Sequence, residues 1–189
     1  MNDTDLKNNL KNRCPWANHD EEMTKYHDEV WGVPLYDDEM LFAKLSLDLM
    51  QAGLSWRTIL HKQKNFEQAF DNFGIKIVST YDETKINQLL NNAGIVRNRL
   101  KISSIINNAN QVIKIQEKFG SFSKYLWSFT KGEIIKNKYA QIPPSSPLSD
   151  IISADLKKNG FKFVGTTIIY AFLQAVGIID DHLPSCFRY

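Results

Sequence analysis

The sequence predicts an all-α fold, and three observations support this prediction. Apolar residues recur mostly three and four positions apart, which is the spacing of residues on one face of a helix. Glycines stand where this pattern breaks off, a common position just beyond a helix end; they are Gly53, Gly94, Gly120, Gly160 and Gly177. The chain has 189 residues, of which 43% are hydrophobic, so it is long enough to bury one core.

The first predicted helix begins at Asp37 or Asp38 and ends near Ala52. An aspartate at this position can accept a hydrogen bond from a free N–H group of the first helical turn. The apolar stripe of the helix comprises Leu41, Phe42, Leu45 and Leu49. Ser55 then begins a second helix, which continues through Ile59 and Leu60.

Further helices are predicted near residues 65–72, 82–92, 97–118, 121–130, 148–158 and 164–176. Residues 142–147 read Ile-Pro-Pro-Ser-Ser-Pro, which is too rich in proline for a helix and indicates an ordered connector. The polar, asparagine-rich residues 1–12 are expected to be a disordered or frayed tail. Residues 13–189 are expected to form a single helical domain.

Charge and hydropathy argue against membrane and secreted classes of protein. No apolar run approaches the roughly 20 residues of a membrane span, and the N-terminus does not resemble a secretory signal, so we expect a cytoplasmic protein. The net charge is +2, but residues 1–50 hold 5 Lys and Arg against 11 Asp and Glu, whereas residues 51–189 hold 18 against 10. This polarity can orient a protein on a polyanion, but charge alone favours the simpler explanation that solvated helix faces are basic.

One unit has the form of a helix, a glycine-containing hairpin and a second helix. Helix 82–92 leads into Ala93-Gly94-Ile95, and the next helix begins near Arg97 and carries Arg99 and Lys101. Backbone N–H groups of such a hairpin can hold a DNA phosphate, and basic residues beyond it add attraction. A plain corner between two helices, with the glycine as a cap, is the alternative.

The two cysteines lie at opposite ends of the chain, each with a histidine nearby. The spacings are Cys14-x12-His27 and His182-x3-Cys186. Two thiolates and two imidazoles form a complete tetrahedral zinc site with no position for water, so the predicted metal is structural and joins the two ends. A disulfide between the ends, or two unrelated free thiols, remain as alternatives.

These motifs resemble the bacterial 3-methyladenine DNA glycosylase I family from about Arg13 to Cys186. The matching stretches, in chain order, are Arg13-Cys14-x-Trp16, Tyr26-His27-Asp28-Glu29-x-Trp31-Gly32-Val33-Pro34, Gln51-Ala52-Gly53-Leu54-Ser55-Trp56, Asn92-Ala93-Gly94-Ile95-x-Arg97-x-Arg99-x-Lys101-Ile102 and Gly160-Phe161-Lys162-Phe163-Val164-Gly165-Thr166-Thr167. The resemblance implies a helix–hairpin–helix DNA glycosylase fold in which a structural zinc ion joins the N- and C-terminal segments. Its zinc ligands are then Cys14, His27, His182 and Cys186, and its hairpin is Ala93-Gly94-Ile95.

The resemblance also implies a function. The family hydrolyses the N-glycosidic bond of 3-methyladenine in alkylated double-stranded DNA and leaves an abasic site, without a covalent lysine intermediate. Its lesion pocket falls on Trp16, Tyr26, Gln51 and Trp56, whereas we assign Trp31 to the core. The residues expected to contact DNA are Gly94, Ile95, Arg97, Arg99, Lys101 and Lys162.

Asp48 is the expected catalytic carboxylate, and here the chain departs from the resembled family. The family has a glutamate at this position, so the side chain of Asp48 is one methylene shorter, and Met50 stands where a polar residue is expected. The alternative function is therefore a module of the same fold that binds alkylated DNA but has lost turnover. The resemblance implies no protein partner, no membrane association and a monomer.

Overall fold

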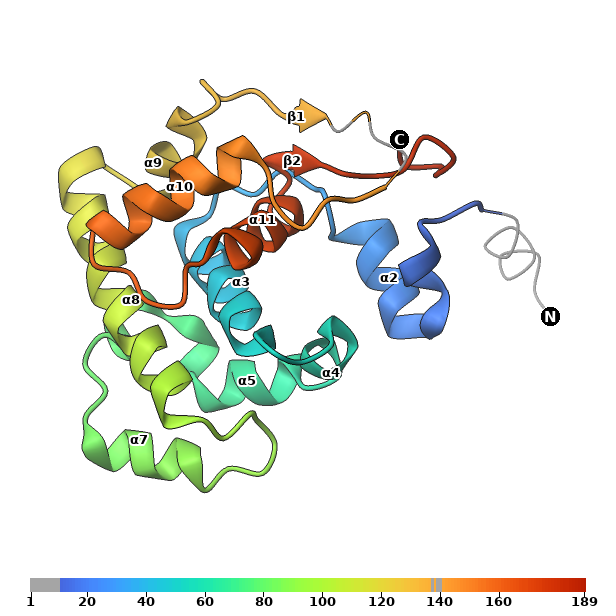
Figure 1. Cartoon of the computed structure of the whole chain (residues 1–189). Helices are drawn as coiled ribbons and strands as arrows, with labels where there is room; N and C mark the ends of the chain where they lie inside the picture. The colour runs from blue at the N-terminus through green and yellow to red at the C-terminus, as the bar shows by residue number, and fades with distance from the viewer. Residues whose placement is uncertain (1–10, 137, 139–140) are drawn as a thin grey trace.

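Helices make up nearly all of the regular structure in the computed structural model, which describes residues 11–136, 138 and 141–189 (Figure 1). The elements are η1 (Pro15–His19), α2 (Glu21–Glu29), α3 (Asp38–Gln51), α4 (Trp56–Leu60), α5 (Gln63–Ala69), η2 (Asp71–Phe73), α6 (Ile75–Val78), α7 (Glu83–Leu90), α8 (Arg99–Phe119), α9 (Phe122–Ser128), β1 (Ile135–Lys136), α10 (Pro147–Lys158), α11 (Thr166–Ala175) and β2 (Ile179–Asp180). The prediction of a mostly helical protein is confirmed. None of the described helices combines the length and the hydrophobicity that a membrane span requires.

Helix α3 lies at the centre of the molecule and packs against α8, α9 and α11 (Figure 1). All four residues of its predicted apolar stripe are buried. Most of the helix from Leu41 to Met50 is buried, because α3 has neighbours on several sides, and two charged residues, Lys44 and Asp48, are buried with it. Burial of a charged group is unfavourable unless the group is paired or hydrogen-bonded, so these two residues mark α3 as a candidate functional element.

The predicted helix starts agree well with the structure. Asp37 accepts a hydrogen bond from the backbone N–H of Met40 at 2.9 Å, and Ser55 accepts one from Thr58 at 3.2 Å. Four of the five glycines named above adopt positive φ, the exception being Gly94. The proline-rich connector ends one residue earlier than predicted, because Pro147 is the first residue of α10. Proline is favourable there since the first N–H of a helix has no partner.

Several short elements were not predicted, namely η1, α2, η2, α6 and the two strands. The strands pair in parallel, with Ile135 opposite Ile179 and Lys136 opposite Asp180. Elements of two to five residues are too short to show a periodic pattern. Helix α2 is longer, but it begins within the run Asp20–Glu22, where polar residues obscure the apolar spacing.

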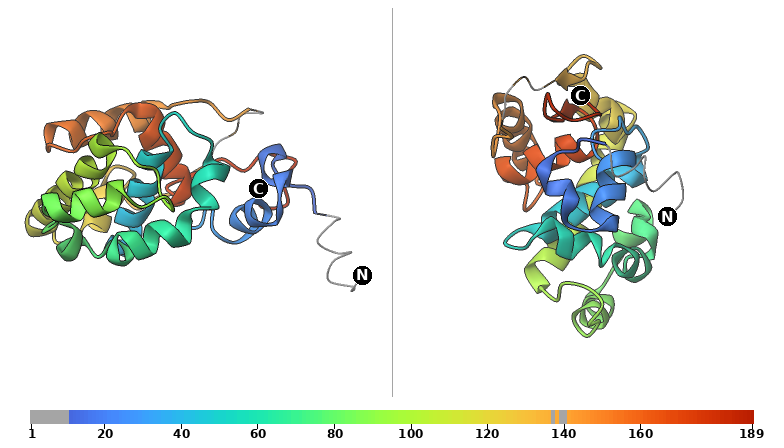
Figure 2. Two further views of the ribbon diagram at one scale, coloured as in Figure 1. Left: turned by 90° about the horizontal axis from the view of Figure 1, so that it is seen from below. Right: turned by 90° about the vertical axis from the view of Figure 1, so that its right-hand side faces the viewer.

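The N- and C-terminal segments lie together at one end of the molecule, beside α2 (Figure 2). The backbone N–H of Phe187 donates to the carbonyl of Asn12 at 2.8 Å, and the side chain of Asn12 donates to the carbonyl of Ser185 at 2.5 Å. Asn12 therefore lies against the C-terminal segment. Residues 1–10 of the predicted tail lie outside the described residues.

Candidate active site and metal centre

A pocket of about 260 Å³ lies between the N-terminal segment, α3, α4 and α11. Its lining comprises Trp16, Met23, Tyr26, Trp31, Asp48, Gln51, Trp56, Ile142, Ala171 and Gln174. The structure thus brings together all five residues that the sequence analysis assigned to the lesion pocket and to catalysis. They come from η1, α2, α3 and α4, which are separate elements of the chain.

Aromatic rings form the walls of this pocket. The ring centroids of Trp16 and Tyr26 are 6.3 Å apart, and those of Tyr26 and Trp56 are 5.0 Å apart. Trp31, which we assigned to the core, is indeed buried, but it also lines the pocket and contacts Trp16 edge to face at 4.9 Å. Rings arranged around a cavity of this size suit a flat, polarisable ligand.

Asp48 places an unpaired carboxyl group in the pocket. The residue is only 4% exposed, and its Oδ2 atom is fully buried with no hydrogen-bond partner among the described residues. Burial raises the pKa of the Asp48 carboxyl to about 8, while the positive charge of Lys44, one helical turn earlier, acts in the opposite direction. A buried acid without a partner in the protein is poised to interact with a ligand.

Lys44 and Tyr26 complete the electrostatic surroundings of Asp48. The Nζ atom of Lys44 lies 5.2 Å from the centre of the Tyr26 ring, and burial lowers the pKa of this lysine. Burial also raises the pKa of the Tyr26 hydroxyl, and the negative charge of Asp48 acts in the same direction. Tyr26 therefore presents a neutral phenol to the pocket at physiological pH.

The sequence analysis missed four residues of the lining, which are Met23, Ile142, Ala171 and Gln174. Ala171 and Gln174 are three residues apart on α11, so they share one face of that helix. No local pattern distinguishes these residues from ordinary core positions. Only the packing of α11 against α3 brings them to the pocket.

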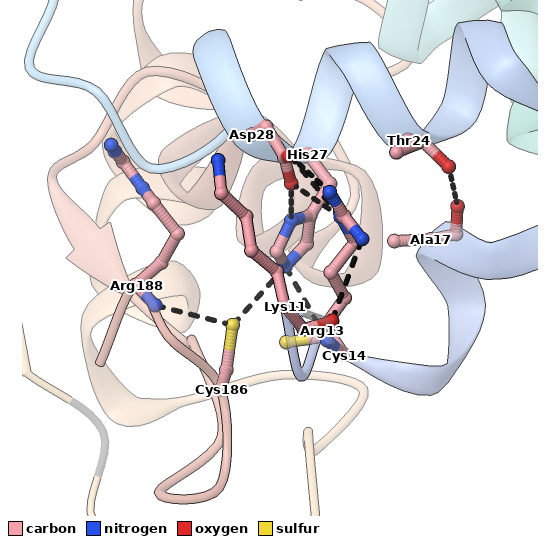
Figure 3. A network of polar contacts seen from close by, with 9 residues as sticks. All are labelled: Lys11, Arg13, Cys14, Ala17, Thr24, His27, Asp28, Cys186 and Arg188. Atoms are coloured by element: carbon pink, nitrogen blue, oxygen red, sulfur yellow. Dashed lines mark hydrogen bonds and ion pairs between the residues drawn. The ribbon is translucent and has the colours of Figure 1, made fainter. Parts of the chain in front are cut away.

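A second cluster joins the two ends of the chain. Cys14, His27 and Cys186 are buried, and their ligand atoms lie within 4.8 Å of one another (Figure 3). Both cysteines are free thiols, and the Nε2 atom of His27 lies 3.4 Å from the sulfur of Cys186. The Nδ1 atom of His27 is hydrogen-bonded to Asp28 at 2.9 Å, and Arg13 binds the same carboxylate at 2.8 Å. Such a carboxylate orients the imidazole so that its Nε2 lone pair faces the cysteines.

His182 lies beside this cluster without joining the three ligand atoms. Its ring centroid is 5.1 Å from that of His27, and its Nδ1 atom is hydrogen-bonded to Asp180 at 2.7 Å. The Nε2 atom is buried and has no hydrogen-bond partner among the described residues. A buried imidazole nitrogen without a partner, held by a carboxylate on its other side, has the environment of a metal ligand.

The predicted hairpin lies between α7 and α8, although α8 begins at Arg99 and not at Arg97. Gly94 donates its N–H to the side chain of Asn92 at 2.8 Å, and a Cβ atom at Gly94 would lie 3.0 Å from the same side-chain oxygen. Ile95 is buried in the core, so only its backbone is available to a ligand. The DNA contact predicted for this hairpin involves backbone N–H groups, so the buried side chain of Ile95 does not test it and the contact stays a prediction.

Lys101 was predicted to face the surface and contact DNA, but it is buried. Its side chain is only 6% exposed, and Nζ donates to the carbonyls of Met50 at 3.0 Å and Ala52 at 2.6 Å. These carbonyls belong to the C-terminal end of α3, where the helix dipole attracts a cation. The assignment of Lys101 to DNA contacts is therefore corrected: the ammonium group is engaged by the end of α3, directly beside Gln51.

The other basic residues assigned to DNA are exposed. Arg97 has no hydrogen-bond partner among the described residues, whereas Arg99 binds Glu83 at 2.7 Å and Asn87 at 2.8 Å. The backbone of Lys162 is held at both its N–H and its carbonyl by the side chain of Asn108, and its own side chain is exposed. Arg97 and Lys162 are thus free to meet a phosphate, while Arg99 must first leave its ion pair.

Comparison with known proteins places the chain in a family. The sequence profile of the methyladenine glycosylase family matches residues 16–189. DNA-3-methyladenine glycosylase 1 of Escherichia coli (strain K12) is 40% identical over 180 residues, which are 94% of this chain and 96% of that protein. A crystal structure of 3-methyladenine DNA glycosylase I has a TM-score of 0.90 at 42% identity, with 93% of this chain and 98% of that one covered. A variant of 3-methyladenine DNA glycosylase I in complex with 3-methyladenine has a TM-score of 0.89 at 38% identity, with coverages of 93% and 96%. The chain belongs to the methyladenine glycosylase family.

Proposed function

We propose that this protein is a DNA glycosylase that releases 3-methyladenine from alkylated double-stranded DNA and leaves an abasic site. The observation that carries the proposal is the aromatic pocket with the buried, unpaired Asp48 carboxyl, found in a member of this family. The relatives named for this activity are covered over almost their whole length by this chain.

The pocket suits a base that has been flipped out of the duplex. Flipping costs a few kcal/mol, which stacking on the walls of Trp16, Tyr26 and Trp56 helps to offset. Methylation at N3 gives the adenine a positive charge, and an electron-rich ring attracts a cation more strongly than a neutral base. The same walls therefore favour the damaged base over normal adenine.

The chemistry requires little acid catalysis. When the N-glycosidic bond breaks, its electron pair stays with the base and neutralises the positive charge. Water forms the new C–O bond to the sugar, supplies the hydroxyl group that remains there and releases its other proton to the solvent. In the ionised form, Asp48 stabilises the cationic base in the pocket, and the cation in turn favours that ionised form. The described residues that line the pocket include no lysine, which supports hydrolysis by water in place of a covalent intermediate.

DNA phosphates would be bound by the hairpin between α7 and α8. The exposed guanidinium of Arg97 and the first N–H groups of α8 lie in one short stretch of chain with Gly94. The N–H of Gly94 donates to the side chain of Asn92 and would have to leave it to bind a phosphate. Lys162 is a further phosphate ligand on the loop before α11, since its side chain is exposed and its backbone is fixed. These contacts position the duplex and carry no sequence preference.

The cluster at the chain ends would hold a structural zinc ion. Cys14, His27 and Cys186 share one site, and the unpaired Nε2 of His182 would supply the fourth ligand. The metal would tie the two terminal segments together, and four protein ligands leave no position for a reacting water. That the protein is a cytoplasmic monomer stays a prediction.

Release of free 3-methyladenine from methylated duplex DNA tests the proposed function. We expect release by the wild type and a strong decrease in Asp48→Asn, which has no charge but nearly the same shape. Asp48→Glu restores the carboxylate length of the resembled family and serves as the matched comparison. Release only by Asp48→Glu would identify a lesion-binding module that has lost turnover, and no release by any of the three would overturn the proposal.

A further inference from the structure

The C-terminal turn of α11 brings an amide group to the pocket. Gln174 lines the pocket on the face of α11 that also carries Ala171, and it is 8% exposed. Its backbone carbonyl accepts a hydrogen bond from the N–H of Gly32 at 3.0 Å, which joins α11 to the N-terminal segment. That bond does not involve the side chain, so the side chain can be changed without removing it.

The orientation of the Gln174 amide is set by a buried carboxylate. The Nε2 group of Gln174 donates a short hydrogen bond to Oδ2 of Asp181, and the same oxygen accepts a hydrogen bond from the hydroxyl of Tyr170 at 2.5 Å. Asp181 and Tyr170 are both buried. An ionised carboxylate only accepts hydrogen bonds, so the NH₂ end of the amide must face Asp181.

The carbonyl end of the same amide is left for the pocket. The Oε1 atom of Gln174 has no hydrogen-bond partner among the described residues. It is also not fully buried, so it remains accessible to a ligand. An amide oxygen can only accept a hydrogen bond. The described lining therefore offers a bound base the Gln174 carbonyl from α11, in addition to the Asp48 carboxyl and the Gln51 amide from α3.

A base with an amino group matches this acceptor, and a base with a carbonyl does not. Adenine carries an exocyclic amine at C6, whereas guanine carries an oxygen there. When 3-methyladenine is linked to its sugar, that amine holds its only N–H donors. We propose that Gln174 is a specificity-determining residue that accepts a hydrogen bond from the exocyclic amine of the lesion, and that Asp181 is the positioning residue that fixes its amide.

This inference rests on the proposed function but can fail separately from it. The competing explanation is that Gln174 merely supplies a donor to the buried Asp181, in which case the base does not contact its carbonyl. A structural role changes the melting temperature and leaves the preference between two ligands as it was. A test must therefore compare ligands that differ only in the amine.

The experiment measures binding of free 3-methyladenine and of 3-methylpurine, which lacks the amine, by quenching of tryptophan fluorescence. Wild type, Gln174→Met and Tyr170→Phe are compared, together with their melting temperatures. The preference of the wild type for 3-methyladenine should fall by about tenfold in Gln174→Met, the effect of one hydrogen bond. Tyr170→Phe removes the other donor to Asp181 and should lower the melting temperature but keep the preference.

An equal preference in folded wild type and Gln174→Met would overturn the inference while leaving the proposed function intact. So would a wild type that binds both bases equally well, whatever the variants do. If Gln174→Met does not fold, Gln174→Leu provides the same comparison. A wild type that binds neither base and releases no 3-methyladenine from DNA would remove the proposed function together with this inference.

Discussion

Asp48 shows how a single side chain can be unfavourable for folding and useful for function. Its carboxyl is enclosed by aromatic and aliphatic groups, and no described residue donates a hydrogen bond to it. Because its pKa is about 8, the Asp48 carboxyl is mostly neutral at pH 7. A cationic base in the pocket would supply the partner that the Asp48 carboxyl lacks among the described residues.

We expect Asp48→Asn to be more stable than the wild type above about pH 5. The folded state keeps its proton up to a pKa of about 8, whereas the unfolded chain loses it near 3.8, so wild-type stability falls as the pH rises between these values. The gain at pH 7 should be about 1–3 kcal/mol, less than the roughly 4 kcal/mol that the pKa difference allows, because the buried amide also lacks partners. Urea unfolding at pH 4 and pH 7 measures it, and a gain that is equal at both pH values would contradict this account.

Base release by the wild type should increase with pH. Since the ionised carboxylate is the form that attracts a cationic lesion, kcat/KM should rise about tenfold from pH 7 to pH 9, as an acid with a pKa of about 8 loses its proton. The methylated base keeps its charge over this range and does not contribute to the profile. Asp48→Asn should show no such rise; a flat profile in the wild type would mean that Asp48 does not act as an anion.

At the scale of the elements, two basic residues near the start of α8 have different surroundings. Arg97 precedes the helix and is exposed, whereas Lys101 lies in the first turn and is directed at the carbonyl end of α3. The difference arises because Arg97 lies in the loop before the helix, whereas Lys101 lies on the side of the first turn that packs against the end of α3. The Lys101 ammonium also connects the hairpin unit to the end of α3 that carries Gln51.

Substitution of Arg97 should therefore affect DNA binding, and substitution of Lys101 should affect stability. Arg97→Ala should keep the melting temperature, weaken DNA binding and decrease the slope of log affinity against log salt by about 0.9, the effect of one phosphate contact. Lys101→Met should lower the stability by about 1–3 kcal/mol, because two carbonyls lose a charged donor. Fluorescence anisotropy over a salt series and thermal unfolding measure the two effects. A Lys101→Met variant that remains fully stable and loses only DNA affinity would reverse our correction.

In the molecule as a whole, the terminal segments depend on each other. The chain ends contact each other through Asn12, Ser185 and Phe187, and the Cys14–His27–Cys186 cluster lies between them. Segments of this kind bury little apolar surface of their own, so the proposed metal would contribute a large share of their stability. The aromatic wall of the pocket includes Trp16 and Trp31, which pack against the same cluster.

Removal of the metal should lower the melting temperature. We expect about one zinc ion per chain by elemental analysis, loss of that zinc and a lower melting temperature in His182→Ala, and neither effect in His19→Ala, an exposed histidine outside the cluster. Chelated protein that is still folded should retain base release, since a closed site has no catalytic position. Loss of catalysis from a folded, chelated protein would show that the metal takes part in the reaction.

The local pattern of the sequence was sufficient for the long helices. Apolar spacing, capping residues such as Asp37 and Ser55, and glycines at helix ends are all properties of a few neighbouring residues, so they can be read without a structure. The four candidate metal ligands were predicted in the same way, because their chemistry and spacing are unusual in a chain with only two cysteines. Three of them, Cys14, His27 and Cys186, share one cluster in the structure.

The positions of individual polar side chains depended on contacts between distant segments. Whether Lys101 meets a phosphate or the end of α3 is decided by a helix about 50 positions earlier, and Gln174 reaches the pocket because α11 packs on α3. Trp31 combines both cases, since its burial was predictable from its size but its place in the pocket wall was not. Helical spacing tells which residues share a face, and only the packing of that face against its neighbours tells what they touch.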